Sequence, residues 1–175
     1  MNGYTSVFSL IDFGSFSNLW FWIAVAVAWS SATHFVIGVP FDMVQRARRK
    51  GGQAMADLEA MAALQARRRV QILSSGGAWL VGFWAMALTS LAVLGFGYGH
   101  ELAQALTLLL LPLTLVSALG VRFALRLTRT PLQGKALARA LTLHRILIQT
   151  IGLTAILITT MWGTWHNLTQ QLMGG

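Results

Sequence analysis

All 13 lysine and arginine residues of this 175-residue chain lie in two stretches, residues 46–69 and 122–145. The long runs on either side of these stretches carry almost no charge. Only 10% of the residues are charged and 55% are hydrophobic, whereas an average soluble domain is about 25% charged. This separation of charge from apolar sequence excludes an ordinary soluble domain and favours a membrane protein.

Four of the apolar runs are long enough to cross a bilayer, which takes about 20 mainly apolar helical residues. They cover residues 18–39, 70–95, 102–121 and 141–165. The fourth run holds one charge, Arg145, about one turn from its start, where a long side chain can reach the headgroups. We therefore predict an all-α polytopic membrane protein with four transmembrane helices in two hairpins and a single membrane domain.

The cations also predict the orientation of the chain. All of them lie in the connections 40–69 and 122–140 or at the adjoining end of the fourth run, whereas the opposite side carries only Asp12 and Glu101. Positively charged loops stay in the cytoplasm. We therefore expect a multi-pass protein of the bacterial inner membrane, with both termini periplasmic.

The two basic connections contain helical signals of their own. Gly51 and Gly52 break any helix that precedes them, and residues 53–65 are strong helix formers with apolar side chains near one face. They predict a short amphipathic helix that runs into the second span. Thr130 followed by Pro131 is typical of a helix start, and predicts that another helix begins there.

Small residues at four-residue spacing mark where transmembrane helices approach closely. Three such stripes occur, one each in the first, second and fourth spans: Ala24, Ala28 and Ala32; Ser74, Ala78 and Gly82; Ala155, Thr159 and Gly163. The stripes predict tight packing within the chain. The alternative is that one of them receives a helix of a partner protein.

Aromatic residues dominate the segment before the first span. Residues 1–17 carry Phe8 and Phe13 with one charge, and Trp20 and Trp22 follow directly. Such a segment is too apolar for a solvated tail, and aromatic rings favour the headgroup layer. We expect it to lie at the outer interface, in contact with lipid or with a neighbouring subunit.

The chain has few residues of the types that catalyse reactions or bind metal ions. The chain has no cysteine and five acidic residues, which excludes thiolate metal sites and leaves little for a carboxylate dyad. Nucleotide-binding and hydrolase motifs are also missing. The net charge of +8 reports membrane orientation rather than nucleic-acid binding. We expect no catalytic residue, no cofactor, no metal and no small-molecule substrate.

Two histidines keep one alternative open. His34 in the first span and His144 in the fourth both lie in the inner half of the bilayer, where a facing pair could ligate a haem iron. His144 adjoins Arg145, however, and the depth of the two histidines differs by about 10 Å at 1.5 Å per residue. We expect histidines satisfied within the bundle rather than a haem site.

The basic clusters are candidates for contact with anionic lipid at the cytoplasmic face. They comprise Arg46, Arg48, Arg49, Arg67, Arg68 and Arg69. The alternative is that they dock an acidic cytoplasmic protein.

Residues 7–49 resemble the opening of a known family. The sequences SFSNLW, GVPFDMV and RARR within this stretch are similar to an alphaproteobacterial family of four-span inner-membrane proteins often labelled "component of SufBCD complex". The resemblance covers about a quarter of the chain. It implies an inner-membrane protein with a tie to iron–sulfur assembly.

These observations predict a non-catalytic accessory or structural subunit, or an assembly factor, of a larger respiratory or photosynthetic membrane complex. Its partners would be other membrane-protein subunits. Three alternatives remain: a membrane anchor for a cytoplasmic assembly, such as an iron–sulfur assembly complex; a haem-b electron carrier; and a small transporter or channel component. The last needs a polar path through the membrane, and the spans contain no Asp, Glu or Lys.

The natural absence of cysteine allows a clean test of the topology. Single cysteines at Thr5, Tyr98 and Gln170 are expected to react with an impermeant thiol reagent added outside sealed cells, because these positions lie opposite the cations. Cysteines at Gln53 and Gln133 are expected to stay unlabelled until the cells are opened. Labelling of Gln53 in sealed cells, with Tyr98 protected, would reverse the orientation.

Overall fold

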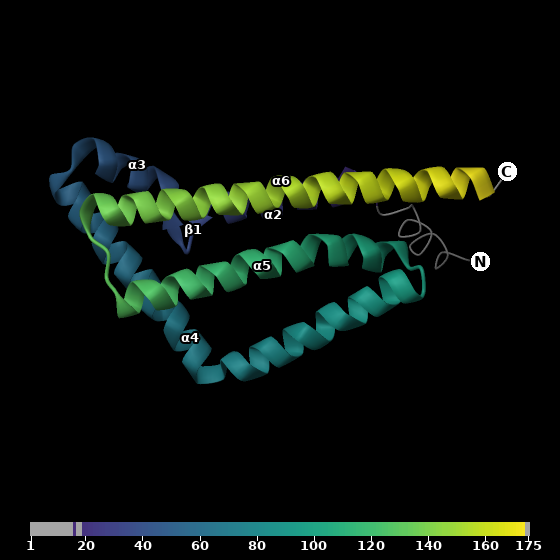
Figure 1. The fold of residues 1–175 in the computed structure, drawn as a ribbon, viewed down its shortest axis with the longest axis horizontal. Coiled ribbons are helices and arrows are strands. Elements are labelled where there is room, and N and C mark those ends of the chain that lie inside the picture. The colour runs from purple at the N-terminus through teal and green to yellow at the C-terminus, as the bar shows by residue number, and fades with distance from the viewer. Residues whose placement is uncertain (1–15, 17–18, 174–175) are drawn as a thin grey trace, which may run out of the picture.

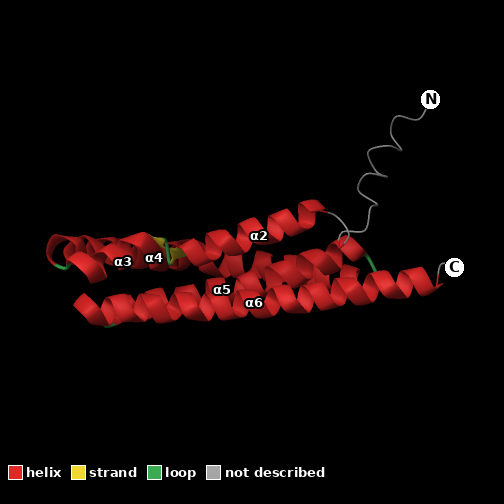
Figure 2. Ribbon diagram, turned by 90° about the horizontal axis from the view of Figure 1, so that it is seen from above, coloured by secondary structure: helices red, strands yellow, loops and turns green. Residues whose placement is uncertain are grey.

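The computed structural model describes Phe16 and residues 19–173, which are helical apart from one small hairpin and short links. The elements are α2 (Leu19–His34), β1 (Phe35–Val36), β2 (Val39–Pro40), α3 (Phe41–Lys50), α4 (Gly52–Ala92), the π-helix η2 (Val93–Gly97), α5 (Glu101–Arg129) and α6 (Gly134–Met173). Helices α5 and α6 run along the length of the molecule, whereas the first half of α4 runs obliquely to them (Figure 1). Figure 2 shows that α2 and α3 lie along the same face of α6.

Three helices of the described residues are long and apolar enough to cross a membrane. Their length and composition indicate a membrane protein. They are the continuous helix of α4 and η2, then α5, then α6 through Thr169. The prediction of all-helical, apolar spans is confirmed for these three, and α5 continues through Pro112 as expected. The predicted helix over residues 18–39 differs, because α2 ends at His34 after 16 residues, a rise of about 24 Å.

A tight hairpin replaces the last part of that predicted helix. Val36 pairs with Val39 across a two-residue turn, and both turn residues, Ile37 and Gly38, have positive φ (50° and 88°). Positive φ at both positions matches the right-handed twist of a hairpin. Glycine adopts it freely, but the β-branched Ile37 does so under strain. Because Ile37 is only 2% exposed, the packing around it holds this conformation.

The tightest core lies at the end of the molecule that carries the cations, which we call the basic end. It joins the hairpin, α3, the first half of α4, the last turns of α5 and the first turns of α6. Its largest fully buried side chains include Val44, Leu58, Leu137 and Leu141. The segments predicted as basic connections are therefore a packed part of the fold, and the predicted amphipathic helix is indeed continuous with the second span.

Helix α4 changes direction sharply along its length (Figure 1). The run Ser74, Ser75, Gly76 and Gly77 lies in its middle, and serine–glycine pairs are sequences at which helices bend. The hydroxyls of Ser74 and Ser75 both donate to the carbonyl of Gln71, at 2.9 and 3.0 Å, and so compete with the helical ladder. The second half of α4 consequently leaves the basic end at an angle.

The start of α6 corrects one expectation. Thr130 and Pro131 do not begin the helix, because the Thr130 backbone closes α5 by donating to the carbonyl of Arg126 at 2.9 Å. The helix α6 starts at Gly134, whose φ of +54° ends the link. The backbone N–H of Gly134 donates to Glu59 Oε1 of α4 at 2.6 Å.

At the end opposite the cations, η2 meets α5 through a glycine. A Cβ placed on Gly95 would lie 2.7 Å from the backbone nitrogen of Gln104 and 2.9 Å from the backbone carbon of Ala103. Only a residue without a side chain allows this approach. Gln104 secures it by donating from Nε2 to the carbonyl of Gly95 at 2.8 Å.

Substitution Gly95→Ala is expected to destabilise the protein by about 1–3 kcal/mol, because the new methyl group meets backbone that cannot rotate away. Thermal unfolding in detergent measures the loss. Gly97→Ala in the same π-helix is the control, since its Cβ would meet only Val93 Cγ1 at 3.8 Å. Equal melting temperatures for the two variants would show that the close contact is not present.

Candidate functional site

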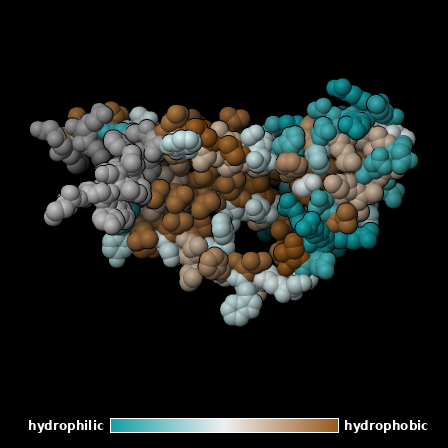
Figure 3. Space-filling view, turned by 180° about the vertical axis from the view of Figure 1, so that it is seen from behind, coloured by the Kyte–Doolittle hydropathy of each residue, from teal (hydrophilic) through white to brown (hydrophobic). Residues whose placement is uncertain are grey.

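A cavity of about 800 Å³ lies between the second half of α4 and α5. It forms because α4 and η2 meet α5 near Gly95 and α4 joins it again at the basic end, while α4 stands away between these places (Figures 1 and 3). Its walls are mostly aliphatic and aromatic, with Leu80, Leu88, Leu110 and Leu113 among them. Apolar cavities of this size hold small molecules or chains in other proteins.

One hydrogen bond crosses the cavity in its middle. Trp84 Nε1 of α4 donates to Thr114 Oγ1 of α5 at 2.7 Å, and both residues line the space. The hydroxyl of Thr114 in turn donates to the carbonyl of Leu110 at 2.7 Å. In an apolar setting such a bond fixes the distance between the two helices, so the gap is held open rather than loosely formed.

The basic end of the cavity is polar. Arg69 of α4 lines it together with Ile37 of the hairpin and Gly120 of α5. A Cβ on Gly120 would lie 2.9 Å from Arg69 Nη1 and 3.7 Å from Ile37 Cγ2. Gly120 therefore provides the space for the guanidinium, and the strained turn at Ile37 packs against the same point.

His144 is the second polar residue of this end. Its side chain is 92% buried and stacks on Phe123, with ring centroids 4.8 Å apart and an interplanar angle of 20°. Within the described residues its Nε2 has no hydrogen-bond partner, although buried polar atoms are almost always satisfied. The unsatisfied nitrogen, on a residue that lines the cavity, points to a group that the described residues do not supply.

The histidines predicted as haem candidates lie in different surroundings. His34 is exposed at the end of α2, with its ring edge-on to Phe35 at 4.7 Å, whereas His144 is buried against Phe123. Two imidazoles on one haem iron need matched positions on either side of the macrocycle. This pair does not fit a haem site. Within the described residues, no three His, Cys, Asp or Glu side chains are grouped closely enough to hold a metal ion.

The predicted basic residues divide into separate sets rather than one patch. Arg46 pairs with Asp42 at 4.0 Å on the surface of α3, Arg49 and Arg68 are exposed, and Arg67 borders a smaller pocket beside Glu59. Arg69 alone turns to the cavity between α4 and α5. The single cluster read from the sequence therefore has several distinct environments.

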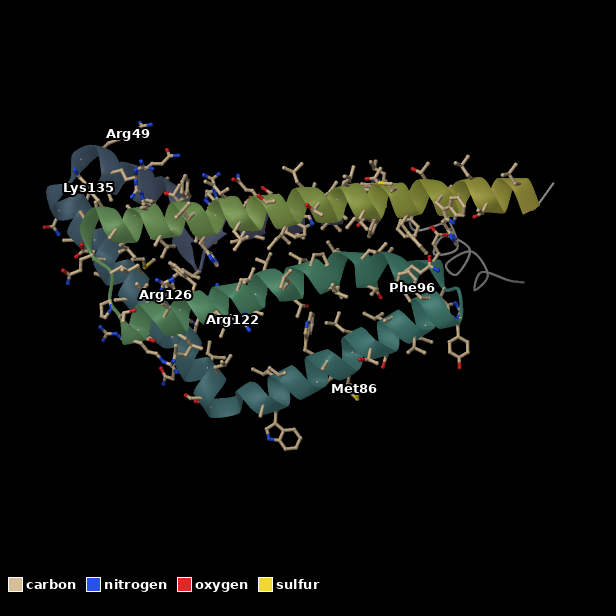
Figure 4. The ribbon with its side chains drawn as sticks, in the orientation of Figure 1. Arg49, Met86, Phe96, Arg122, Arg126 and Lys135 are labelled. Atoms are coloured by element: carbon tan, nitrogen blue, oxygen red, sulfur yellow. The ribbon has the colours of Figure 1, made fainter. Side chains whose placement is uncertain are left out.

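Arg48 belongs to a groove that the sequence did not predict. The groove, of about 1040 Å³, lies between α3, α5 and α6 and carries four cations: Arg48, Arg126, Lys135 and Arg139. None of the residues lining it is acidic. Figure 4 shows Arg126 and Lys135 at this end of the molecule, on α5 and α6. The signal in the sequence was present, as cations in both connections, but their meeting depends on the fold.

The aromatic residues before α2 are described only in part. Phe8 and Phe13 lie outside the described residues. Trp22 is half-buried, and its Nε1 donates to the carbonyl of Phe16 at 3.0 Å; Trp20 is 75% exposed. Phe16 itself is buried and contacts α6, because a Cβ on Gly163 would lie 3.0 Å from its side chain.

A polar cluster at the end opposite the cations escaped the sequence analysis. Glu101 Oε1 accepts from the Phe16 backbone at 2.8 Å, and its Oε2 lies 3.7 Å from His166 Nε2. Beside it, Gln104 Oε1 accepts from Trp162 Nε1 at 3.0 Å. These contacts tie Phe16 to α5 and join α5 to α6, a structural role that requires no ligand.

The three small-residue stripes differ in how far they are buried. In α6, Ala155, Thr159 and Gly163 are buried within the chain, so the prediction of intramolecular packing is confirmed there. In α2, Ala28 and Ala32 pack against a second buried cluster formed by α2, α5 and α6, while Ala24 is exposed. In α4, the whole stripe is exposed: Ser74, Ala78 and Gly82. A Cβ on Gly82 would meet nothing within 4 Å.

No protein-family model matches the sequence, and the searches of curated proteins and of solved structures give no match.

Purified protein is expected to show no Soret absorption band, because His34 and His144 have unlike surroundings and do not form a ligand pair. The measurement is an oxidised and a dithionite-reduced visible spectrum of protein from haem-replete cells. A stoichiometric b-type spectrum that both His34→Ala and His144→Ala abolish would contradict this assignment.

Proposed function

We propose that this protein is a non-catalytic accessory subunit of a larger complex in the bacterial inner membrane. In this proposal α2 is a fourth span, the basic end faces the cytoplasm, and the first and last residues lie on the periplasmic side. The 16-residue α2 is short for a span, but α2 and the buried hairpin together cover more depth, and bilayers adjust to short helices at modest cost.

The exposed stripe of α4 carries the proposal. In the most apolar 18-residue window of the α4–η2 helix only 6% of residues are buried, against 28% for α6. The side facing α5 lines the cavity, whereas Met86 points away from α5 (Figure 4). Ser74, Ala78 and Gly82 lie on the exposed helix at the spacing by which small residues admit a second helix. A transmembrane helix of a partner subunit fits this surface.

Large side chains next to the stripe add to the surface. Trp79, Phe83 and Met86 are 87%, 65% and 62% exposed, and their spacing places them on one side of α4. A small-residue groove bordered by aromatic side chains is the kind of surface in which a few residues supply most of the binding energy. These exposed side chains support the docking of a partner helix. In a stand-alone protein, lipid alone would cover them.

A second candidate is a membrane anchor for an acidic cytoplasmic assembly. The groove of Arg48, Arg126, Lys135 and Arg139 supports it, because four cations without an acidic residue among the lining attract an anionic surface. The resemblance of residues 7–49 to the family tied to iron–sulfur assembly points the same way.

Substitution Ala78→Leu is expected to release the protein from its complex without disturbing its own fold. The larger side chain fills the stripe on the exposed side of α4, and a loss of about tenfold in association corresponds to 1.4 kcal/mol. The measurement is co-migration with larger partners on a native gel of mild-detergent extracts from the native host, relative to total membrane abundance.

Ala26→Leu is the matched control, because Ala26 is an exposed alanine of α2 outside the stripe. It is expected to leave co-migration unchanged. Equal behaviour of the two variants, or a wild-type protein that migrates alone, would contradict the accessory-subunit proposal.

A further inference from the structure

The cavity between α4 and α5 has the polarity of an amphiphile-binding site. Its length is lined mostly by apolar side chains, and the one Lys or Arg of its lining, Arg69, lies with His144 at the basic end. In Figure 3 a hollow opens beside hydrophilic side chains, with hydrophobic side chains along its other border. A ligand that fills it needs an apolar chain and a polar head at one end.

The charge of that head follows from Arg69. The guanidinium is half-buried, and no carboxylate of the described residues lies within ion-pair distance of it, since the ion pairs found there are Arg46–Asp42 and His166–Glu101. A partly buried cation without a counter-charge is costly. The head of the ligand is therefore anionic, and a phosphate suits the planar fork of an arginine.

His144 supplies the second, independent observation. Its Nε2 is buried and has no partner within the described residues, and the ring is held in place by stacking on Phe123. As an N–H donor, this nitrogen can bind one oxygen of an anion that Arg69 holds. The two side chains come from different helices, α4 and α6, so an anion between them would also join the helices.

The lining of the cavity selects the apolar part. The space of about 800 Å³ is lined mainly by aliphatic and aromatic side chains, which suit an acyl chain. The partner helix proposed above would dock on Ser74, Ala78 and Gly82, which adjoin the cavity-lining face of α4 but do not line the cavity themselves.

We propose that the cavity between α4 and α5 binds an anionic phospholipid of the cytoplasmic leaflet. Arg69 and His144 hold the phosphate, and an acyl chain lies between the two helices beside Trp84. The cations at the same end of the molecule place this head at the depth of the inner headgroups. The lipid then fills the space that the bend in α4 creates.

Lipid binding to the full-length protein tests the proposal. Detergent-purified protein is delipidated and titrated with phosphatidylglycerol or with phosphatidylcholine of the same acyl chains, and native mass spectrometry counts the bound lipid. Wild type is expected to retain one phosphatidylglycerol with at least about tenfold preference over phosphatidylcholine. Arg69→Gln is expected to lose this preference, and Arg68→Gln, at the exposed neighbouring arginine, is expected to keep it.

A second variant tests the chain-binding part and does not alter the charge. Ala118→Phe fills the cavity from α5, where Ala118 lines it, and is expected to reduce lipid retention about tenfold while the melting temperature of delipidated protein stays unchanged. Ala26→Phe on α2 is its control. If Arg69→Gln fails to fold, comparison of Ala118→Phe with Ala26→Phe still tests whether the cavity binds the lipid.

Three results would overturn the proposal. The first is equal retention of the two lipids by wild type. The second is an equal loss in Arg68→Gln and Arg69→Gln, which would indicate a general surface charge effect. The third is displacement of the lipid by inorganic phosphate or glycerophosphate at equal concentration, which would show that the site takes a phosphate without a chain.

Discussion

Close approach at glycine decides where the helices of this protein meet. Lipid gives apolar helices no hydrophobic reason to associate, so backbone contacts that only a glycine allows become the main attachment points. A Cβ on Gly95 would strike the backbone of α5, one on Gly152 would lie 2.7 Å from a tryptophan ring of α2, and one on Gly163 would press on Phe16. Gly82, in the second half of α4, faces open space instead. Helix α4 is thus packed closely at its two ends and is held at a distance from α5 between them, where Trp84 donates to Thr114.

This attachment at two ends gives the molecule two unlike surfaces on one helix. One side of α4 borders a cavity that ends at Arg69 and His144. The adjoining face carries an exposed stripe of small residues, none of which lines the cavity. A lipid in the cavity would hold α4 at a fixed distance from α5. A partner helix would then dock on the stripe of this fixed helix. The buried core of the basic end holds parts of both α4 and α6 together, and the remainder of each helix extends away from it.

The sequence predicts those parts of the fold that depend on local composition. Long apolar runs reveal α4, α5 and α6, and the glycine pair at residues 51–52 marks the break before α4. The hairpin after His34 stays hidden, because valine, isoleucine and glycine before Pro40 continue the apolar run and carry no change of period. Thr130 misleads because its hydroxyl donates back to the carbonyl of Arg126 at the end of α5, at 2.9 Å, instead of capping the next helix.

The candidate site lies beyond such reasoning altogether. Arg69 reads as the last of three equivalent arginines, and only its direction on the helix, just before the bend, brings it to the cavity while Arg68 stays exposed. His144 reads as a histidine at the start of a span, and its unsatisfied nitrogen depends on packing against Phe123. The environments of both residues depend on contacts between segments that are distant in the sequence.

A density map of the protein in lipid nanodiscs, with a bound antibody fragment to add mass, tests the central claim most directly. The account predicts α4 separated from α5 between the bend and Gly95, with a rod of lipid density in the gap that ends at Arg69. A map in which α4 packs along α5 without a gap would contradict it.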